Sequence, residues 1–593
     1  MGDDAARWAT RGRTTKVLLV VHNVTAATRL LDVLPLFHDD LRVQVLATGP
    51  GSSAFRSGLE ELLAAVGVPV LPWEQAVATP VALAISASLG GRLDAVPGKL
   101  VVLSHGVGYP KRLGLPGAGS REPGAGSREP GAGSREPGAG SREPGAGSRE
   151  PGAGSPPPVF GMSPEWLLDP EGRPIADALV LSHPEQAERL RAGCPEASAT
   201  GVVAGDPCWD RVVAARPDRA RFRRALGTGR GRRLVLLTST WNPESLFGDG
   251  GDDVLPSLLP RLAAELPADE YRTAAVLHPN IWHGHGPGQV RAWLDRARRA
   301  GLALIDPLDG WRQALLAADV VIGDHGSVTY YAAALGTPVL LAAAPLAGLD
   351  ASAPTHAFVR AAPRLDPDRA LRPQVEALMG THHPMPEPAA FVSSAPGASA
   401  ALLRRLFYDL MGLPEPDAPA RLEPLPLLPL DSGSPRVPMT VFTRVTHPDE
   451  VMVTRYADLR PTSAPPGDVH LAVSEDTRET DHLALADLVF RHGPADDPRL
   501  GTPARWAAEV LARHPLAAMA VRVTDPTSCL VRTRSGESLR IAAAPGVDGD
   551  PLAYASGLYA WLAAGWEPGE LPGRRLTVRT GDVAHAVTVD QVK

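Results

Sequence analysis

Residues 16–49 read KVLLVVHNVTAATRLLDVLPLFHDDLRVQVLATG, and the hydrophobic pattern of this stretch decides the fold class. An apolar run over 16–21 is followed by apolar residues at helical spacing over 26–37 and by a second apolar run over 43–47. This order predicts a strand, a helix and a strand joined by short turns. Two strands with a helical crossover between them are normally parallel neighbours in one sheet. The sequence therefore predicts an α/β fold.

The same alternation continues over much of the chain, whose 593 residues leave room for about three domains. We expect two Rossmann-like domains, at 16–215 and 216–413, with a helix over 400–411 closing the second. Residues 1–15 carry charges of both signs without an apolar core, and we expect them to form a flexible tail.

A heptad repeat interrupts the first domain. PGAGSRE stands five times in succession from Pro116 and ends in PGAGS at Ser155. Each copy holds proline and glycine but no large apolar residue, so it has no face to bury. We expect the insertion, taken as residues 116–158, to be a disordered passive spacer rather than a binding arm, because the Arg and Glu of each copy cancel in charge.

Two further segments follow the second domain. Residues 414–436 are rich in proline and predict a linker with few contacts. From residue 437 the chain turns to short strand-like runs, such as MTVFTRV at 439–445 and LTVRT at 576–580, mixed with a few helical stretches. This texture predicts a small, separate α+β domain over 437–593, whose role the sequence does not indicate.

Charge and composition exclude several classes of function. Lys and Arg number 59 and Asp and Glu 66, a formal net charge of −7, so the chain as a whole has no field that would attract nucleic acid. Three cysteines without C-x-x-C spacing favour neither a disulfide framework nor a structural zinc site. No apolar stretch reaches the roughly 20 residues of a spanning helix, and we expect a cytoplasmic protein with at most peripheral membrane contact. Arginine-rich stretches at 219–224 and 291–299 favour such contact only weakly, because such stretches more often form solvated helix faces.

Polar residues cluster where predicted strands end, which is where open α/β sheets place their ligands. His105 follows the strand KLVVLS, and Lys111 and Arg112 come soon after it. A histidine there can act as a base, and the two cations can contact phosphate. The same residues would also be ordinary in a surface loop.

A second strand end carries His278, within VLHPNIWHGHG. Two more histidines, His283 and His285, follow it, which raises a zinc site as an alternative. No carboxylate or cysteine nearby completes a set of ligands, so the sequence does not favour a metal.

A third strand end, Asp324-His325-Gly326-Ser327, leads directly into a helical stretch. The amide groups of the first helical turn and the Ser327 hydroxyl would form an anion site, and Gly326 would let a phosphate approach the backbone. Ser327 would serve equally well as a simple helix cap. A fourth turn, AGDPCWD, places Asp210 at the start of another helix, where it can also be no more than a cap.

Taken in order, these segments resemble the CDP-glycerol glycerophosphotransferase family, the teichoic-acid-type polymerases and primases with a GT-B fold of two Rossmann domains. SHGVGYPK is similar to the family's Trp-His-Gly turn and following Pro-Leu-Lys, LSHPEQAERL to its strand-Ser-Pro step, and AGDPCWD to its Gly-x-Pro-Arg-x-Asp turn. TSTWNPE, VLHPN and DHGSV are similar to its Pro-Thr-Trp-Arg, Arg-x-His-Pro and Asp-Tyr-Ser-Ser-Val segments. The resemblance runs from about Lys16 to Leu413, apart from the repeat.

The resemblance implies roles for individual residues. His105 matches the family's proposed base for the acceptor hydroxyl, and His278 matches the histidine at the donor phosphates. Ser327 matches the second serine of the helix-start motif. We group Gly326, Ser327, Lys111 and Arg112 as donor-phosphate residues and Asp324, Asp210 and Trp241 as supporting residues, and the resemblance implies neither a metal nor a cofactor.

Three positions depart from the family pattern. Cys208 or Trp209 stands where the turn usually supplies Arg, Asn242 follows Trp241 in place of Arg, and Gly326 replaces the first Ser. Each lost charge-assisted hydrogen bond would weaken pyrophosphate binding by about 1.5–3 kcal/mol. The resemblance therefore does not fix CDP-glycerol as the donor.

We accordingly expect a transferase of the cell-wall glycopolymer type. It would move a phospho-polyol or related group from a nucleotide-activated donor, CDP-glycerol or a related CDP or UDP conjugate, to a hydroxyl acceptor. Family acceptors are lipid-linked, which implies work at the inner face of the membrane. A nucleotide-sugar glycosyltransferase and a UDP-sugar 2-epimerase-like enzyme are alternatives with the same fold, and a non-catalytic binding protein with a decayed site is a third.

Deleting residues 123–150, which are four copies of the repeat, should leave the melting temperature of the protein almost unchanged. The deleted segment has nothing to bury, and halving a flexible loop changes its closure free energy by less than ~1 kcal/mol. Calorimetry of the parent and the deletion variant tests this. A fall of many degrees would show that the repeat packs against the folded domains.

Overall fold

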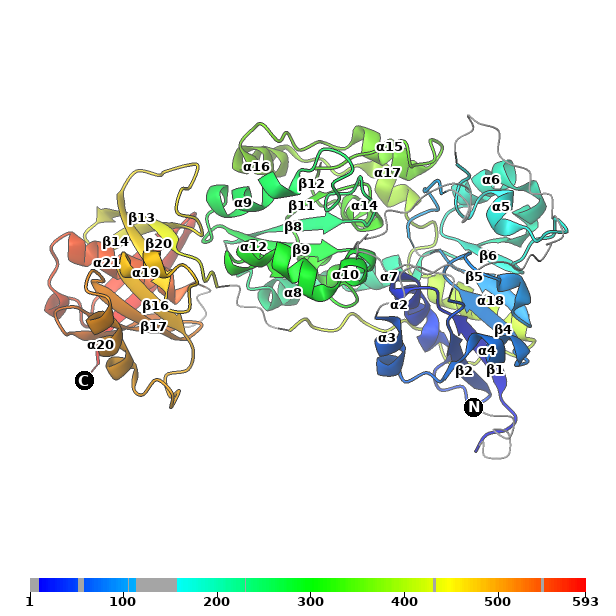
Figure 1. The fold of residues 1–593 in the computed structure, drawn as a ribbon, viewed down its shortest axis with the longest axis horizontal. Coiled ribbons are helices and arrows are strands. Elements are labelled where there is room, and N and C mark those ends of the chain that lie inside the picture. The colour runs from blue at the N-terminus through cyan, green and yellow to red at the C-terminus, as the bar shows by residue number, and fades with distance from the viewer. Residues whose placement is uncertain are drawn as a thin grey trace, which may run out of the picture.

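The computed structural model describes residues 10–51, 58–104, 106–113, 157–229, 231–429, 434–544 and 549–592. Most of the predicted tail, the whole PGAGSRE repeat and His105 therefore lie outside the described residues. The described chain forms three bodies in a row, two α/β domains and a β-barrel (Figure 1).

The described residues of the N-terminal domain form a seven-stranded parallel sheet in the order β3-β2-β1-β4-β5-β6-β7. Its first elements, β1 (Thr15–Val20), α2 (Val24–Val33) and β2 (Val43–Thr48), are the strand, helix and strand predicted from residues 16–49. β1 is buried between β2 and β4. The other elements are β3 (Val70–Leu71), β4 (Leu83–Ser86), β5 (Lys99–Val102), β6 (Ala178–Leu181), β7 (Gly201–Val203), α3 (Leu59–Val66), α4 (Trp73–Ala78), α5 (Pro164–Leu167), α6 (Pro184–Gly193), α7 (Pro207–Ala214) and the 3-10 turns η1 (Leu34–Phe37), η2 (Leu93–Ala95) and η3 (Pro195–Thr200).

The second α/β domain has, over its described residues, a five-stranded parallel sheet in the order β10-β9-β8-β11-β12. The strands are β8 (Arg233–Ser239), β9 (Tyr271–Leu277), β10 (Ala303–Leu304), β11 (Val320–Gly323) and β12 (Val339–Leu341). The helices are η4 (Arg216–Asp218), α8 (Arg219–Ala225), α9 (Leu255–Glu265), α10 (Pro279–His285), α11 (Pro287–Trp293), α12 (Asp295–Arg299), α13 (Trp311–Ala317), α14 (Ser327–Ala334), α15 (Pro354–Ala361), α16 (Leu371–Thr381) and α17 (Pro386–Phe391). The two parallel sheets fit the pair of Rossmann-like domains of a GT-B fold.

Helix α18 (Ser399–Met411) crosses back to the first domain, although the sequence analysis assigned it to the second. Its apolar side chains Leu403 and Phe407 are fully buried in the core that also holds β1. The Phe407 ring stacks on Phe37 with 5.6 Å between ring centroids. The apolar face of α18 therefore completes the N-terminal core rather than the core of the domain that precedes it in sequence.

Residues 414–429 run along both α/β domains without forming a helix or strand. Arg211 on α7 donates to the carbonyl of Glu423 at 2.7 Å, and Gln313 on α13 donates to that of Pro426 at 2.9 Å. Leucine side chains of the segment pack on the cores of the two domains. The expectation of few contacts is therefore wrong here, because the leucines between the prolines find apolar surface to cover.

The C-terminal domain is a closed β-barrel, so the expected α+β fold is wrong for it. Its described strands pair in the order β13-β14-β20-β21-β19-β18-β17-β16-β15, and β15 pairs back with β13. They are β13 (Met439–His447), β14 (Glu450–Tyr456), β15 (Asp468–Ser474), β16 (Leu488–His492), β17 (Met519–Asp525), β18 (Ser528–Thr533), β19 (Ser538–Ala543), β20 (Arg575–Thr580) and β21 (Val583–Gln591). The strand-like runs recognised in the sequence fall on β13, β14, β15, β18, β20 and β21, and β16, β17 and β19 were not predicted. Closure satisfies the edge strands through partners far apart in sequence, which a local pattern does not show.

Helix α21 (Pro551–Ala563) lies inside this barrel. Its side chains are buried on every face, and it contacts β13, β14, β17, β18, β19 and β20. Gly557 lets the helix approach the wall, because a Cβ there would lie 2.9 Å from Val451 and 3.0 Å from Val578. A helix that is apolar all round must be surrounded by protein, and here the barrel surrounds it. Two further helices, α19 (Thr480–Ala484) and α20 (Pro503–Arg513), and the turn η5 (Pro568–Glu570) complete the domain.

A buried ion pair joins the barrel to the second α/β domain. The Arg455 side chain on β14 is 1% exposed, and its Nε and Nη2 donate to Asp269 Oδ1 at 3.0 and 2.6 Å. The same Nη2 donates to Asp550 at 2.7 Å. The Arg455 amide also donates to Asp269 at 2.9 Å, and its carbonyl accepts from Ala268 at 2.8 Å. Side chain and backbone together fix the orientation of the barrel.

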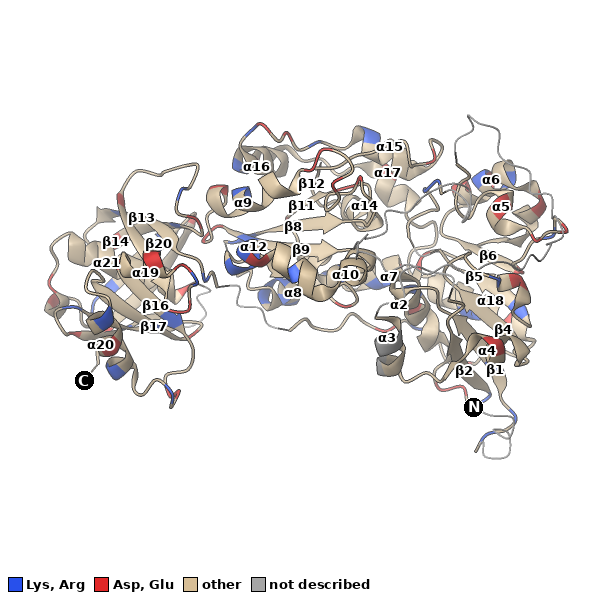
Figure 2. Cartoon of the chain, viewed as in Figure 1, with Lys and Arg blue, Asp and Glu red and all other residues tan. Residues whose placement is uncertain are grey.

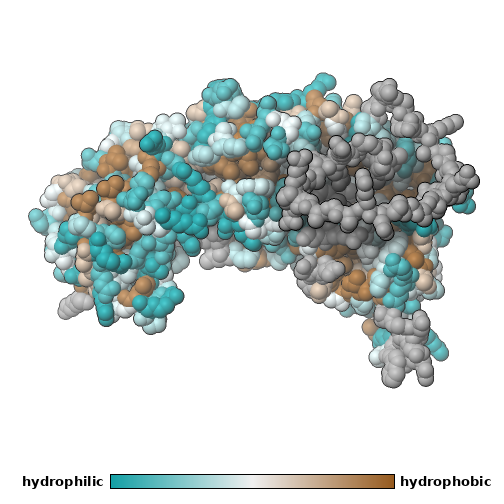
Figure 3. All heavy atoms as spheres, in the orientation of Figure 1, coloured by the Kyte–Doolittle hydropathy of each residue, from teal (hydrophilic) through white to brown (hydrophobic). Residues whose placement is uncertain are grey.

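Helices α8 and α12 are rich in arginine (Figure 2), and several of these arginines form ion pairs. On α8, Arg219 and Arg223 pair with Asp319 at 2.7 and 2.6 Å. On α12, Arg299 pairs with Glu479 of the barrel at 2.7 Å. Figure 3 shows small apolar patches among polar side chains on the visible face of the barrel and the middle domain. None of the described helices is both long and apolar enough to cross a bilayer, and the expected peripheral membrane contact stays a prediction.

Replacing Asp269→Ala should lower the free energy of unfolding by about 3–5 kcal/mol, because Arg455 would stay buried with half of its charge partners gone. Urea unfolding followed by circular dichroism measures the change. The control is Arg296→Ala at the same domain boundary, whose exposed pair with Asp458 should be worth less than ~1 kcal/mol. Equal small losses in both variants would show that the ion pair does not anchor the barrel.

Candidate functional site

A cleft runs between the two α/β domains. It holds about 1280 Å³ of space that protein atoms do not fill, part of it open to solvent. The first domain lines it with α2 and the turn after β5, and the second with the turns after β8, β9 and β11. These turns follow the carboxyl ends of parallel strands, so both sheets direct their ligand-binding edges at the same space.

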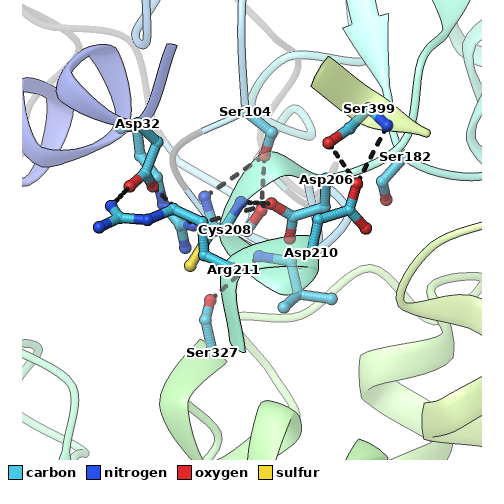
Figure 4. Close-up of polar contacts among 12 residues, drawn as sticks. Asp32, Ser104, Ser182, Asp206, Cys208, Asp210, Arg211, Ser327 and Ser399 are labelled. Atoms are coloured by element: carbon cyan, nitrogen blue, oxygen red, sulfur yellow. Dashed lines mark hydrogen bonds and ion pairs between the residues drawn. The ribbon is translucent and has the colours of Figure 1, made fainter. Parts of the chain in front are cut away.

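Helix α14 begins at this cleft. Its first residue is Ser327, whose Oγ accepts a hydrogen bond from the amide of Val107 in the opposite domain at 3.1 Å (Figure 4). Gly106 permits this contact, because a Cβ there would lie 2.8 Å from Ser327 Oγ. Ser327 therefore ties the domains together. The amide groups of the first turn have no partner within the helix and are the groups that would bind an anion.

Asp324 and Gly326 shape the turn that precedes α14. The buried carboxylate of Asp324 accepts from the amides of Thr240 at 2.9 Å, Leu246 at 3.0 Å and Gly326 at 2.9 Å. A Cβ on Gly326 would lie 2.9 Å from Asp324 Oδ1 and 3.0 Å from Thr240 Cβ. Asp324 thus holds the turns after β8 and β11 together, and the glycine is needed for these two turns to pack.

His278 lies at the start of α10 and spans the cleft. Its Nδ1 accepts from the amide of Asn280 at 3.1 Å, so the proton of the neutral ring lies on Nε2. Nε2 in turn lies 3.5 Å from Thr25 Oγ1, on α2 of the opposite domain. The Trp241 ring is tilted against the imidazole with 6.5 Å between centroids. The geometry therefore presents an N–H donor to the cleft.

Lys111 crosses the cleft from the first domain. Its ammonium lies 5.5 Å from the centre of the Trp241 ring and 3.4 Å from Thr240 Oγ1. Burial lowers the pKa of Lys111, and the charge of Asp324 opposes that shift. The structure thus brings Lys111, Trp241, His278, Asp324, Gly326 and Ser327 of the expected set to one cleft.

Arg112 and Asp210 lie elsewhere. Arg112 donates to Asp350 at 3.4 Å and to the carbonyl of Pro157 at 3.0 Å. Asp210 accepts from the amides of Gly397 at 2.7 Å and Ser399 at 3.0 Å, at the start of α18 (Figure 4). Neither side chain lines the cleft as the described residues form it. We therefore leave both out of the functional proposal.

Two other histidines singled out in the sequence, His105 and His285, are not seen to act in the cleft of the described structure. His105 lies outside the described residues, while its neighbours Ser104 and Gly106 both line the cleft. His285 is exposed and its ring packs edge-on against Trp293, with 5.0 Å between centroids. Over the described chain, no group of three or more His, Cys, Asp or Glu side chains is arranged to hold a metal ion.

His325 is a cleft residue that the sequence analysis quoted but did not select. It is 5% exposed, it lines the cleft, and its Nδ1 has no hydrogen-bond partner among the described residues. Burial lowers the pKa of this imidazole. Its position between Asp324 and Gly326, both of which were selected, was the signal that could have found it.

A buried network of charged groups joins the two domains beneath the cleft. Arg29 on α2 lines the cleft and donates to the Tyr331 hydroxyl on α14 at 3.2 Å. Tyr331 donates to Asp206 at the start of α7, and Arg29 lies 3.8 Å from the same carboxylate. Burial raises the pKa of Asp206, against the effect of Arg29. Sequence analysis had no signal for these contacts, which join residues far apart in the chain.

The same network continues through Asp32 on α2. Its buried carboxylate accepts from Arg211 on α7 (Figure 4) and from Arg312 on α13, the second at 2.7 Å. Arg312 Nε also donates to Cys208 Sγ at 3.3 Å. Within this network three arginines face two aspartates, which leaves one positive charge in excess below the cleft.

Removing one hydroxyl, by Tyr331→Phe, should lower the free energy of unfolding by about 1–3 kcal/mol, because Asp206 and Arg29 would lose a buried partner. The adjacent Tyr330 is an ideal control. It is equally buried, but its hydroxyl has no partner among the described residues, so Tyr330→Phe should change stability by less than ~0.5 kcal/mol. Thermal unfolding of both variants tests the pair, and similar losses would show that the hydroxyl bridge is not a stabilising contact.

No protein-family model and no curated protein matches this chain. Solved structures do match it. A structure of the wall teichoic acid polymerase TagF soaked with CDPG is 12% identical, with 68% of this chain and 90% of that chain covered and a TM-score of 0.42. UDP-GlcNAc 2-epimerase from Methanocaldococcus jannaschii is 10% identical, with 66% and 100% covered and a TM-score of 0.40. A glycosyltransferase from Rickettsia africae is 10% identical, with 67% and 96% covered and a TM-score of 0.33. The structures similar to this chain thus include a teichoic acid polymerase, the kind of enzyme that the sequence resemblance named.

Proposed function

We propose that this protein is a transferase that moves a group from a nucleotide-diphosphate donor to a hydroxyl acceptor bound in the interdomain cleft. One observation carries the proposal. The Nε2 of His278, the ammonium of Lys111 and the start of α14 come from three separate turns and all meet in that cleft. An N–H donor, a cation and unpaired helix amides are the groups that bind phosphate oxygens.

His278 and α14 would hold the phosphates of the donor. Because His278 Nδ1 is occupied by the amide of Asn280, its Nε2–H is directed to the cleft as a fixed hydrogen-bond donor. The positive end of the α14 dipole adds to this field. Lys111 supplies the formal charge from the other domain, so donor binding would draw on both domains at once. These groups would stabilise the charge that develops on the leaving nucleotide.

The finer proposal is phospho-polyol transfer, and it rests on the sequence resemblance. The acceptor oxygen would attack the outer phosphorus, the bond from that phosphorus to the bridging oxygen would break, and the nucleoside monophosphate would leave. His105 would take the hydroxyl proton as general base. A lipid-linked acceptor would bring the protein to the inner face of the membrane, as the resemblance implies.

The position of Arg29 in the cleft favours an active site rather than a decayed one. Cys208 or Trp209 stands in place of the family's turn arginine, yet the Arg29 side chain lines the cleft, and Arg312 contacts the Cys208 sulfur. The network that holds these arginines carries one positive charge in excess, so the region has kept a cation that a phosphate could meet. Arg29 on α2 would thus supply a cation to the cleft in place of the missing arginine.

The proposed function is tested with a panel of CDP-glycerol, other CDP esters and UDP-sugars. Binding at 100 times the dissociation constant would stabilise the protein by about 2.7 kcal/mol, which a thermal-shift assay detects. Release of CMP on adding a hydroxyl acceptor would support phospho-polyol transfer. Release of UDP would favour the glycosyltransferase alternative, and conversion of UDP-GlcNAc without acceptor would favour the epimerase. No binding of any donor would contradict the proposal.

The two expected histidines should separate in their effects. His105→Ala should lower turnover by about 10²- to 10⁴-fold while donor affinity stays the same, because a general base acts on the acceptor. His278→Ala should weaken donor binding as well as turnover, because it removes a donor to the phosphates. Steady-state kinetics and calorimetric titration measure both, with the exposed His285→Ala as control. If His105→Ala turns over an identified donor as fast as the parent protein does, His105 is not the general base.

A further inference from the structure

His325 has a buried nitrogen with no partner inside the site just described. The side chain is more than nine-tenths buried, it lines the cleft, and Nδ1 has no hydrogen-bond partner among the described residues. It stands one residue before the N-cap of α14. A buried polar atom is normally satisfied, so an unsatisfied ring nitrogen on a histidine that lines a ligand cleft indicates a proton or partner that arrives with the ligand.

Burial and Lys111 oppose a positive charge on His325, whereas the carboxylates of Asp324 and Glu244 favour one. Lys111 faces it from the opposite domain, and the positive end of α14 lies next to it. Asp324 adjoins it, but that carboxylate is already shared among the amides of Thr240, Leu246 and Gly326. Glu244, in the turn after β8, is exposed and therefore screened. Burial is the main cause of the lowered pKa of His325, Lys111 adds to it, and Asp324 opposes it. The net effect favours the neutral imidazole in the empty cleft.

A bound diphosphate would reverse this balance, because it places negative charge beside the helix start and Lys111. We propose that His325 takes up a proton when the nucleotide-diphosphate donor binds, and so becomes a phosphate-binding cation only in the complex. This inference rests on the proposed function. The step is a proton transfer from solvent to the neutral imidazole, and the resulting imidazolium carries two N–H groups and a positive charge at the cleft, next to the phosphates.

His278 does not fit this role. Its Nδ1 already accepts from the Asn280 amide, so a second proton on that ring would break the hydrogen bond that starts α10. The proposal therefore distinguishes two histidines of one site. His278 is a permanent N–H donor, and His325 is a donor whose charge depends on the ligand.

Proton uptake can be measured directly. Calorimetric titration of the full-length protein with CDP-glycerol and UDP-glucose at pH 7.5 is repeated in buffers of different ionisation enthalpy, and the slope gives the protons taken up. Diphosphate diesters do not titrate near neutral pH, so the ligand contributes no protons. We expect the parent protein to take up as much as about one proton for each ligand bound. Its affinity for the donor should then rise by up to about tenfold for each unit by which the pH is lowered.

His325→Asn should bind the donor more weakly and without this uptake, because Asn can hydrogen-bond at the Nδ1 position but cannot take a proton. His105→Asn and the exposed His285→Asn should keep the uptake. If His325→Asn does not fold, as judged by circular dichroism, His325→Tyr replaces it with another ring that cannot take a proton near neutral pH.

The outcomes separate this inference from the proposed function. If the parent binds no member of the donor panel, the proposed function fails and this inference fails with it. If the parent binds but takes up no proton, or if the uptake survives in the His325 variants and is lost in His105→Asn, the inference alone is overturned. Uptake that is present in the parent and absent only in the His325 variants supports it.

Discussion

The cleft depends on buried polar contacts that join the two α/β domains. Asp32 on α2 accepts from Arg312 on α13, and Tyr331 on α14 links Arg29 with Asp206. Burying any of these groups without its partner would be strongly unfavourable, so the domains are held where the partners meet. That placement sets the width of the cleft. The contact of Ser327 with the amide of Val107, and the 3.5 Å approach of His278 to Thr25, both follow from it.

The two parallel sheets and most of the cleft residues can be predicted from the sequence. Buried parallel strands are continuous apolar runs with polar residues at their carboxyl ends, so residues 16–49 and the turns at His278 and Asp324 can be recognised locally. The sequence was not sufficient for α18 or for the barrel. Which core an apolar helix completes, and which strands close a barrel, depend on partners distant in the chain. Helix α21 shows this most clearly, because being apolar on every face indicates burial but not by what.

In the candidate site, too, the local sequence does not show which distant contacts hold a side chain. Arg112 lies in the segment after β5 and Asp210 lies within α7, and each is held by contacts away from the cleft, with Asp350 and with the start of α18. His325 went unselected because its two neighbours explained the motif without it. A sequence motif indicates which turn binds a ligand, while burial and unsatisfied atoms indicate which side chain in that turn does so.

The electrostatics of the cleft favour a site adapted to fewer arginines. A guanidinium is charged whether or not a ligand is present, so several of them in a closed cleft repel one another when it is empty. A neutral imidazole at His325 avoids that repulsion and still becomes a cation when phosphate arrives. Lys111, whose pKa is lowered by burial, and Arg29, whose charge is shared with Asp206, also carry less free charge than exposed cations would. The absence of arginine at Cys208 or Trp209, and at Asn242, is then consistent with phosphate binding. Other elements supply positive charge, and His325 gains its charge only when the ligand binds.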